Sequence, residues 1–378
     1  NQGGVIEAGG VSLRNVRFSG SRYGTIKAFD ASEIEMDGDL TITAQDKWYF
    51  SALRLLVSGK FINQGRFEAD AGLTIKAKEI VNGLHTMLLT GVKGQLELNA
   101  NNIRNQGLIS GGYNVISATG TIDNSGSLIS GLLRLKAQKL VNGGLINSTE
   151  SYIESSQLEN NGQIVRSQGN DSGQTLIQIK ADNIINRGEI NADFTHILSG
   201  TLRNIGSGTI VGKHTGISAQ LLENRPERLA SGEMKLATIG ATERLDLGVK
   251  RLINKDESVI FSLGDMALGG RLNDSFEAEG KADFVDNASA KFDIQGNAWV
   301  NAAQFLNRDT HVREGAPLVT REYIKQYARF VNGAQVSEWL QEGKDGHYYR
   351  NNRSHQETWF DRHYGRDVYS QAGVVDIW

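Results

Sequence analysis

The stretch LELNANNIRNQGLIS, residues 96–110, carries the pattern that decides the fold. Leu96 and Leu98 alternate with polar residues, which is typical of a half-buried strand. Nine residues after Leu96 stands Asn105, the first residue of a five-residue unit of Asn, any residue, Gly, any residue and an apolar residue. A second short apolar run begins at Leu108. The stretch therefore predicts two short strands separated by a glycine turn.

The Asn unit recurs along the chain at an interval near 19 residues. It is complete at Asn1, Asn63, Asn105, Asn124, Asn142, Asn160 and Asn186. It continues in weaker form at Asn82, Asn204, Asn224, Asn254, Asn273, Asn287 and Asn307. An alternating apolar pair begins nine residues before five of these Asn, at Leu73, Leu96, Leu133, Ile177 and Leu245. Because hairpin turns need no constant offset of this kind, we expect these five residues to lie buried in one stacked column.

Short strands at such a period, with no room for a helix longer than one turn, predict an all-β fold, a right-handed parallel β-helix with one coil per period. At a strand spacing near 4.8 Å, residues 1–310 would form about 16 coils. We expect the Asn amides to stack into a hydrogen-bonded ladder, and the following Gly to supply a turn with positive φ. The alternative is an antiparallel sandwich in which each Asn–Gly forms a separate hairpin turn.

Composition excludes several classes of function. Charged residues make up 22% and nearly balance, with a net charge of −3, so the chain lacks the basic surface that nucleic-acid binding requires. Its apolar stretches are too short for a membrane span, and we expect no membrane insertion by this segment. The absence of cysteine excludes thiol catalysis, zinc–thiolate sites and disulfides. The sequence begins at Asn1 with a repeat unit, which predicts that any targeting signal lies upstream.

The composition changes after residue 310. Residues 311–378 hold 11 of the 28 aromatic residues, so we divide the chain into a repeat region, 1–310, and an aromatic-rich non-repeat segment, 311–378. Residues 317–333 fit either a helix or extended strands. The segment would either cap the open end of the β-helix or bind a partner through exposed aromatic residues.

Candidate binding residues are concentrated within 17 positions of this segment. Aromatic and arginine side chains are the usual high-energy anchors of protein interfaces, whereas the flanks of a β-helix are repetitive and polar. The candidates are Tyr348, Tyr349, Arg350, Arg353, Trp359, Arg362 and Tyr364. Irregular loops that break the period, such as those near residues 225–250, are a second place where recognition is expected.

Catalytic and metal-binding motifs are not recognisable in the sequence. The even spacing of His347, His355 and His363 is compatible with a metal site, but polar surface is the preferred interpretation. The carboxylates of Glu33, Glu35, Asp37 and Asp39 would share one face of a strand, where they would bind Ca²⁺ or form a solvated acidic face, the interpretation we favour. We assign no catalytic, cofactor or metal residue and expect no enzyme. The alternative is a secreted β-helix polysaccharide lyase or hydrolase, which rests on fold analogy alone.

The Asn units, together with the segment Ile260–Leu268, resemble the filamentous haemagglutinin repeats of large bacterial exoproteins exported by two-partner secretion. The passage Phe305–Thr310, followed later by Trp359–Arg362, looks like the point in those proteins where repeats give way to a non-repeat segment. The resemblance implies a β-helical filament that is secreted and projects from the outer surface of a Gram-negative bacterium.

Members of this superfamily include adhesins, haemolysins and the effectors of contact-dependent growth inhibition, which combine a receptor-binding region with a C-terminal toxin. No nuclease, pore or protease signature is recognisable, so the resemblance implies a stalk or receptor-binding region rather than the toxin. The partners that it implies are an outer-membrane protein or surface glycan of a target cell and, during export, the outer-membrane transporter.

Overall fold

The computed structural model describes residues 4–16, 24–166, 174–314, 319–331, 334–335, 340–341, 357–369 and 374–376. The chain divides into two compact units, Asn1–Arg308 and Asp309–Trp378. All regular structure in the described ranges is β-strand. A search of these ranges for helices long and apolar enough to cross a membrane finds none.

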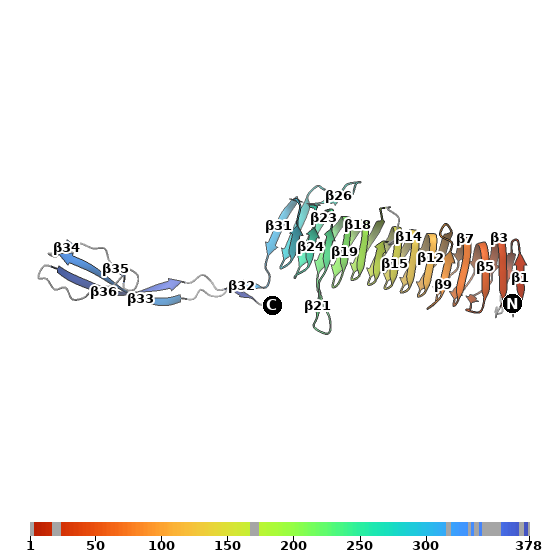
Figure 1. Ribbon diagram of the computed structural model, residues 1–378, viewed down its shortest axis with the longest axis horizontal. Helices are drawn as coiled ribbons and strands as arrows, with labels where there is room; N and C mark the ends of the chain where they lie inside the picture. The colour runs from red at the N-terminus through yellow and green to blue at the C-terminus, as the bar shows by residue number, and fades with distance from the viewer. Residues whose placement is uncertain are drawn as a thin grey trace. The chain divides into compact units, whose positions relative to one another are not determined.

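The first unit is a parallel β-helix of about 14 turns, built on one sheet of 27 strands. Every pairing described within this sheet is parallel, so the sandwich of separate hairpins is excluded. Figure 1 shows the coils stacked one after another from β1 to β31. The strands are β1 (Val5–Ala8), β2 (Ser12–Val16), β3 (Thr25–Met36), β4 (Leu40–Ile42), β5 (Lys47–Val57), β6 (Lys60–Asn63), β7 (Arg66–Lys76), β8 (Glu79–Asn82), β9 (Met87–Thr90), β10 (Gln95–Ala100), β11 (Asn102–Asn105), β12 (Leu108–Ala118), β13 (Thr121–Asn124), β14 (Ser127–Asn142), β15 (Leu145–Asn160), β16 (Gln163–Arg166), β17 (Leu176–Asn186), β18 (Glu189–Ile205), β19 (Thr209–Arg225), β22 (Thr238–Ala241), β23 (Arg244–Lys255), β24 (Val259–Ser262), β25 (Asp265–Gly269), β28 (Ala282–Ala288), β29 (Lys291–Ile294), β30 (Ala298–Val300) and β31 (Ala302–Arg308).

The predicted hydrophobic column is confirmed. Its five members are buried in the interior, and all belong to one column of register partners. Leu73 pairs directly with Leu96. In the intervening coils, the same column position holds a polar residue. These residues are Asn114, Ser151, Thr195 and Thr215. The alternation of apolar and polar residues therefore identified the interior column correctly, although some interior positions are polar.

The predicted asparagine ladder is also present, inside the β-helix. Each Asn donates from Nδ2 to the Oδ1 of the Asn one coil further on, at 2.7–2.9 Å. The ladder runs through Asn63, Asn82, Asn105, Asn124, Asn142, Asn160, Asn186, Asn204, Asn224, Asn254, Asn287 and Asn307. Most of these amides also donate to a backbone carbonyl, which satisfies their second N–H. Asn1 lies outside the described residues.

The expected role of the repeat glycines was wrong. Gly107, Gly126, Gly144 and Gly162 are absent from the residues with positive φ. They are required instead because successive coils approach too closely for a side chain. A Cβ on Gly144 would lie 2.1 Å from the carbonyl oxygen of Gly126, and a Cβ on Gly162 would lie 2.1 Å from the carbonyl oxygen of Gly144. The glycines form a column in which each one makes room for the backbone of its neighbour.

The β-helix has about 14 turns rather than the expected 16, because some coils are longer than 19 residues. Within the described ranges, the chain leaves the coil path at two places. Residues 226–237, which we call the arm, contain the antiparallel pair β20 (Glu227–Arg228) and β21 (Met234–Lys235). Residues 270–281, which we call the excursion, contain the antiparallel pair β26 (Arg271–Leu272) and β27 (Ala278–Glu279). Asn273, which we expected in the ladder, lies in the excursion, so Asn254 pairs directly with Asn287.

The second unit is built of antiparallel strands. β32 (Val312–Glu314) pairs with β37 (Val374–Asp376). The long strand β33 (Val319–Val331) pairs with β36 (Glu357–Tyr369) through thirteen register partners. β34 (Ala334–Gln335) and β35 (Leu340–Gln341) also pair with β33. Of the two alternatives for residues 317–333, the extended one is therefore right where the structure describes them, at 319–331.

Candidate functional site

Three of the seven predicted binding residues lie on one strand of the second unit. Trp359, Arg362 and Tyr364 belong to β36, where their register partners on β33 are Arg329, Gln326 and Ile324. The other four, Tyr348, Tyr349, Arg350 and Arg353, lie outside the described residues. Their role in recognition stays a prediction.

The four carboxylate candidates for a metal site do not share one strand face. Glu33 and Glu35 lie on β3, but Asp37 and Asp39 follow the end of that strand. The Asp37 carboxylate accepts from the Ser58 hydroxyl, and that of Asp39 accepts from a backbone N–H. His363 lies on β36, whereas His347 and His355 lie outside the described residues. Over the described ranges, no group of three or more His, Asp or Glu residues has a geometry that could hold a metal ion.

The loops expected near residues 225–250 correspond in part to the arm, which protrudes from the stack in Figure 1. Its base is fixed by a bidentate ion pair, because Arg187 donates from Nε and Nη2 to the two carboxylate oxygens of Glu227 at 2.9 and 3.1 Å. Hydrogen bonds from Arg187 lower the pKa of Glu227. Leu229, Met234 and Leu236 are exposed on the arm. Residues 238–241 and 244–250, by contrast, belong to the regular coil strands β22 and β23.

The excursion covers part of the outer face of β19 and β23. It lies very close to this face, and two outward glycines make the approach possible. A Cβ on Gly248 would lie 2.2 Å from the backbone carbon of Arg271, and a Cβ on Gly216 would lie 3.2 Å from Phe276. Glycine at an outward strand position is typical of a place where another backbone packs closely.

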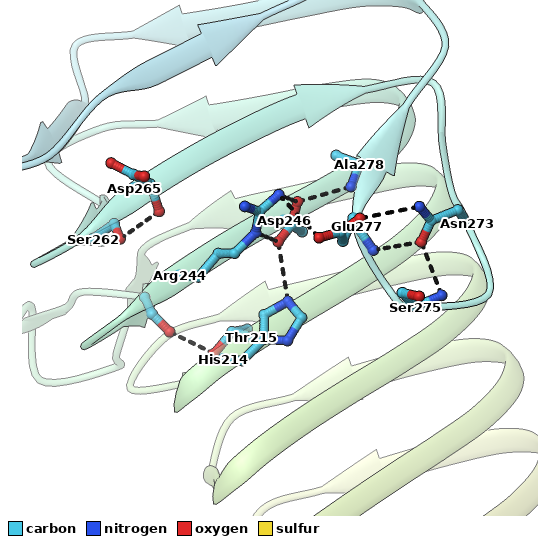
Figure 2. Close-up of polar contacts among 11 residues, drawn as sticks. His214, Thr215, Arg244, Asp246, Ser262, Asp265, Asn273, Ser275, Glu277 and Ala278 are labelled. Atoms are coloured by element: carbon cyan, nitrogen blue, oxygen red, sulfur yellow. Dashed lines mark hydrogen bonds and ion pairs between the residues drawn. The ribbon is translucent and has the colours of Figure 1, made fainter.

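Beneath the excursion lies an ionic group around a buried carboxylate, which we call the Asp246 cluster (Figure 2). The Asp246 side chain has no exposed surface. Its Oδ2 accepts from Nε of Arg244 at 2.6 Å and from Nε2 of His214 at 3.0 Å. Its Oδ1 accepts from Nη2 of Arg244 at 3.1 Å and from the backbone N–H of Ala278, in the excursion, at 2.8 Å. The cluster therefore fastens the excursion to the β-helix.

The four hydrogen bonds decide the charge of this carboxyl group. Burial alone would raise the pKa of Asp246, but hydrogen bonds from His214, Arg244 and Ala278 and the charge of Arg244 together lower it. Both oxygens already accept two donors, so the carboxylate is poorly placed to act as a general base. The arrangement is that of a structural anchor.

A neutral histidine supports the excursion from the next coil. His196 is buried, and its ring stacks on Phe276 with a centroid distance of 3.7 Å and an interplanar angle of 15°. Phe276 has a φ of 60°, in the left-handed region that bulky residues rarely adopt. Burial, and then the neighbouring His214, lower the pKa of His196 to about 4, although Asp246 acts in the opposite direction. The imidazole is thus uncharged at neutral pH.

We expect the stability of the β-helix to fall on acidification because of His196. Between pH 6.5 and about 4 the unfolded chain binds a proton that the folded protein excludes. The contribution is therefore complete above pH 6.5 and is lost as the pH falls, by about 3 kcal/mol at most. In His196→Phe, which keeps the stacking on Phe276, urea unfolding should depend less on pH over this range.

The exposed His85 offers a matched control for the loss of a histidine side chain, because its φ of 61° is tolerated by asparagine. The pH dependence should change more in His196→Phe than in His85→Asn. An unchanged pH dependence in His196→Phe would contradict the assignment.

Sequence reasoning missed the Asp246 cluster. Asp246 stands between Leu245 and Leu247, where an acidic residue looks like an ordinary solvated position. The available signal was the pair of glycines at outward strand positions, Gly216 and Gly248, which marks the close approach of another segment.

Comparisons with known proteins give two partial similarities. The chain is 30% identical over 125 residues, 33% of its length, to the "Deoxyribonuclease CdiA" of Dickeya dadantii strain 3937. It is 29% identical over 170 residues, 43% of its length, to the "tRNA nuclease CdiA" of Yersinia mollaretii. The matches span only 4% and 6% of those proteins. No protein-family model and no solved structure matches the chain. The similarity supports a relationship to CdiA proteins.

Proposed function

We propose that this chain is a rigid extracellular β-helical segment of a bacterial surface exoprotein that presents or forms a surface for recognition of a target cell. The observation that carries the proposal is the ladder of twelve Asn amides, eleven of them buried, which joins every coil from Asn63 to Asn307 to the next. A stack of this kind is stabilised by contacts between neighbouring coils and is suited to act as a stiff spacer.

The partial similarity to CdiA proteins supports a contact-dependent inhibition effector over a plain adhesin. In this proposal the segment is secreted and stands on the outer surface of a Gram-negative bacterium. Its partners are an outer-membrane protein or surface glycan of the target cell and, during export, an outer-membrane transporter. The full-length gene separates the two classes, because an effector requires a toxin region and an adjacent immunity gene, whereas an adhesin has neither.

Recognition itself is tested with purified protein. The labelled chain is incubated with intact cells of a panel of Gram-negative bacteria that includes Dickeya dadantii and Yersinia mollaretii, and retention on the cells is measured. Saturable retention on one or more species is expected. The competing class, a polysaccharide lyase or hydrolase, is tested by release of reducing sugar from cell-surface polysaccharides. Sugar release without saturable retention would overturn the proposal.

The residues Trp359 and Tyr364 are expected to act in recognition. Trp359→Ala and Tyr364→Ala should each weaken retention at least about tenfold, because aromatic anchors dominate binding energy at interfaces. The melting temperature should stay unchanged. If both variants melt earlier, and retention falls only in proportion to unfolding, these residues serve to cap the fold and the expectation is wrong.

A further inference from the structure

A groove lies near the N-terminal end of the β-helix, on the outer side of three consecutive coils. Its volume is about 800 Å³, within the usual range of small-ligand sites. Strands β3, β5 and β7 supply its lining. The lining side chains that matter for its chemistry are Lys27, Phe29, Tyr49, Ser51, Glu68 and Asp70.

Two aromatic side chains on the groove are strongly exposed. Phe29 is 63% exposed and Tyr49 is 49% exposed. Tyr49 lies in register between Lys27 on the preceding coil and Glu68 on the next coil. Phe29 and Ser51 stand where the register between neighbouring strands shifts, at Ala28/Ala31 and Phe50/Ala52. Such irregularities redirect side chains, and here they occur on neighbouring coils at the groove.

The floor beneath the groove is a packed aromatic core. Trp48 and Phe50, the two neighbours of Tyr49 in the chain, point into the core and are buried. The Trp48 ring packs against Phe50 at a centroid distance of 6.1 Å and against Phe67 at 5.8 Å. Trp48 and Phe50 therefore anchor β5 in an aromatic core, while Tyr49 between them points outward. A ligand that binds here would find a preorganised surface.

The polar groups of the groove are suited to hydroxyl groups. Across the described ranges, the Lys27 ammonium and the Asp70 carboxylate make no side-chain hydrogen bond or ion pair. Glu68 accepts twice from Arg66 through Oε2, which leaves Oε1 open. The groove thus offers a donor and two acceptors beside two aromatic faces. Its charges nearly cancel, since Arg66 pairs with Glu68 and Lys27 balances Asp70.

We propose that this groove binds a neutral oligosaccharide. A sugar ring presents an apolar C–H face, which packs on an exposed aromatic ring, and a rim of hydroxyls, which both donate to carboxylates and accept from an ammonium group. The near-neutral charge disfavours acidic polysaccharides. The inference deepens the proposed function, because a surface glycan is one of the partners considered there. Its test uses free oligosaccharides, so its outcome is separate from retention on cells.

The proposal is tested by saturation-transfer NMR and titration calorimetry on the full chain. The probes are maltoheptaose, cellohexaose, laminarihexaose and mannohexaose, with oligogalacturonate as the acidic comparison. We expect at least one neutral probe to bind with a dissociation constant on the order of 0.1–1 mM, because the groove is open to solvent. Tyr49→Ala and Phe29→Ala should each raise that constant at least about tenfold.

Trp299→Ala is the matched control, because Trp299 is 54% exposed on another coil and does not line this groove. It should bind as the unmodified protein does. Melting temperatures of all variants establish that they are folded. The proposal is overturned if no neutral probe binds below about 10 mM, if oligogalacturonate binds equally well, or if folded Tyr49→Ala binds with unchanged affinity.

Discussion

Ile103→Asp is expected to open the β-helix locally around residues 96–124. Ile103 is buried between Ile80 and Ile122 of the neighbouring coils. An aspartate there loses the packing of the isoleucine and places a carboxyl group in an apolar interior without a partner. The combined cost is at least about 3 kcal/mol. Because each coil contacts mainly its neighbours, the damage should be confined to a few coils.

Hydrogen exchange measures this result directly. Amides of residues 96–124 should exchange faster in Ile103→Asp than in the unmodified chain, and those of β19 and β23 should change little. Asn102→Asp is the control, because Asn102 is exposed and its Oδ1, which accepts from the N–H of Thr121, is retained by aspartate. Uniform acceleration along the whole β-helix would show that the coils unfold together, contrary to this expectation.

Gly144→Ala is expected to be nearly as damaging, although it adds only a methyl group. The new Cβ would lie 2.1 Å from the carbonyl oxygen of Gly126, which belongs to backbone and cannot turn away. The two coils must separate, at a cost of about 2–4 kcal/mol. Thermal or urea unfolding measures the loss.

Gly143 supplies a control one residue away. A Cβ on Gly143 would meet nothing nearer than the Asn124 carbonyl oxygen at 4.0 Å, and its φ is not positive. Both substitutions reduce the freedom of the unfolded chain equally, so their difference reports the close contact alone. Gly143→Ala should change stability by less than about 0.5 kcal/mol. Equal effects from the two substitutions would refute the glycine column.

The parallel coils and their interior column were predictable from sequence because every regular coil must place the same residue types at the same interior positions. An interior Asn must find the same partner in every coil, so Asn105 and Leu96 keep a constant separation wherever the coil is regular. The role of Gly107 was not predictable in this way. A positive φ and a close backbone approach both select glycine, and only the coil spacing distinguishes them.

The candidate site was much less predictable, because it depends on insertions that occur once. Asn273 fell near the expected interval but lies in a turn, where its Oδ1 accepts from the N–H groups of Ser275 and Glu277. No periodic pattern indicates that residues 270–281 fold back over Asp246. The burial of that carboxylate follows from the excursion, so the sequence around Asp246 does not reveal it.

The asparagine ladder also bears on how such a chain folds. Successive ladder partners from Asn63 to Asn307 are separated by 18 to 33 residues in the sequence. Each added coil therefore closes a loop of only 18 to 33 residues, and the entropy of closure does not increase with the number of coils already formed. Contact order relative to length falls as coils are added. Folding from one end resembles templated polymerisation, in which a longer rod requires more steps but no slower ones.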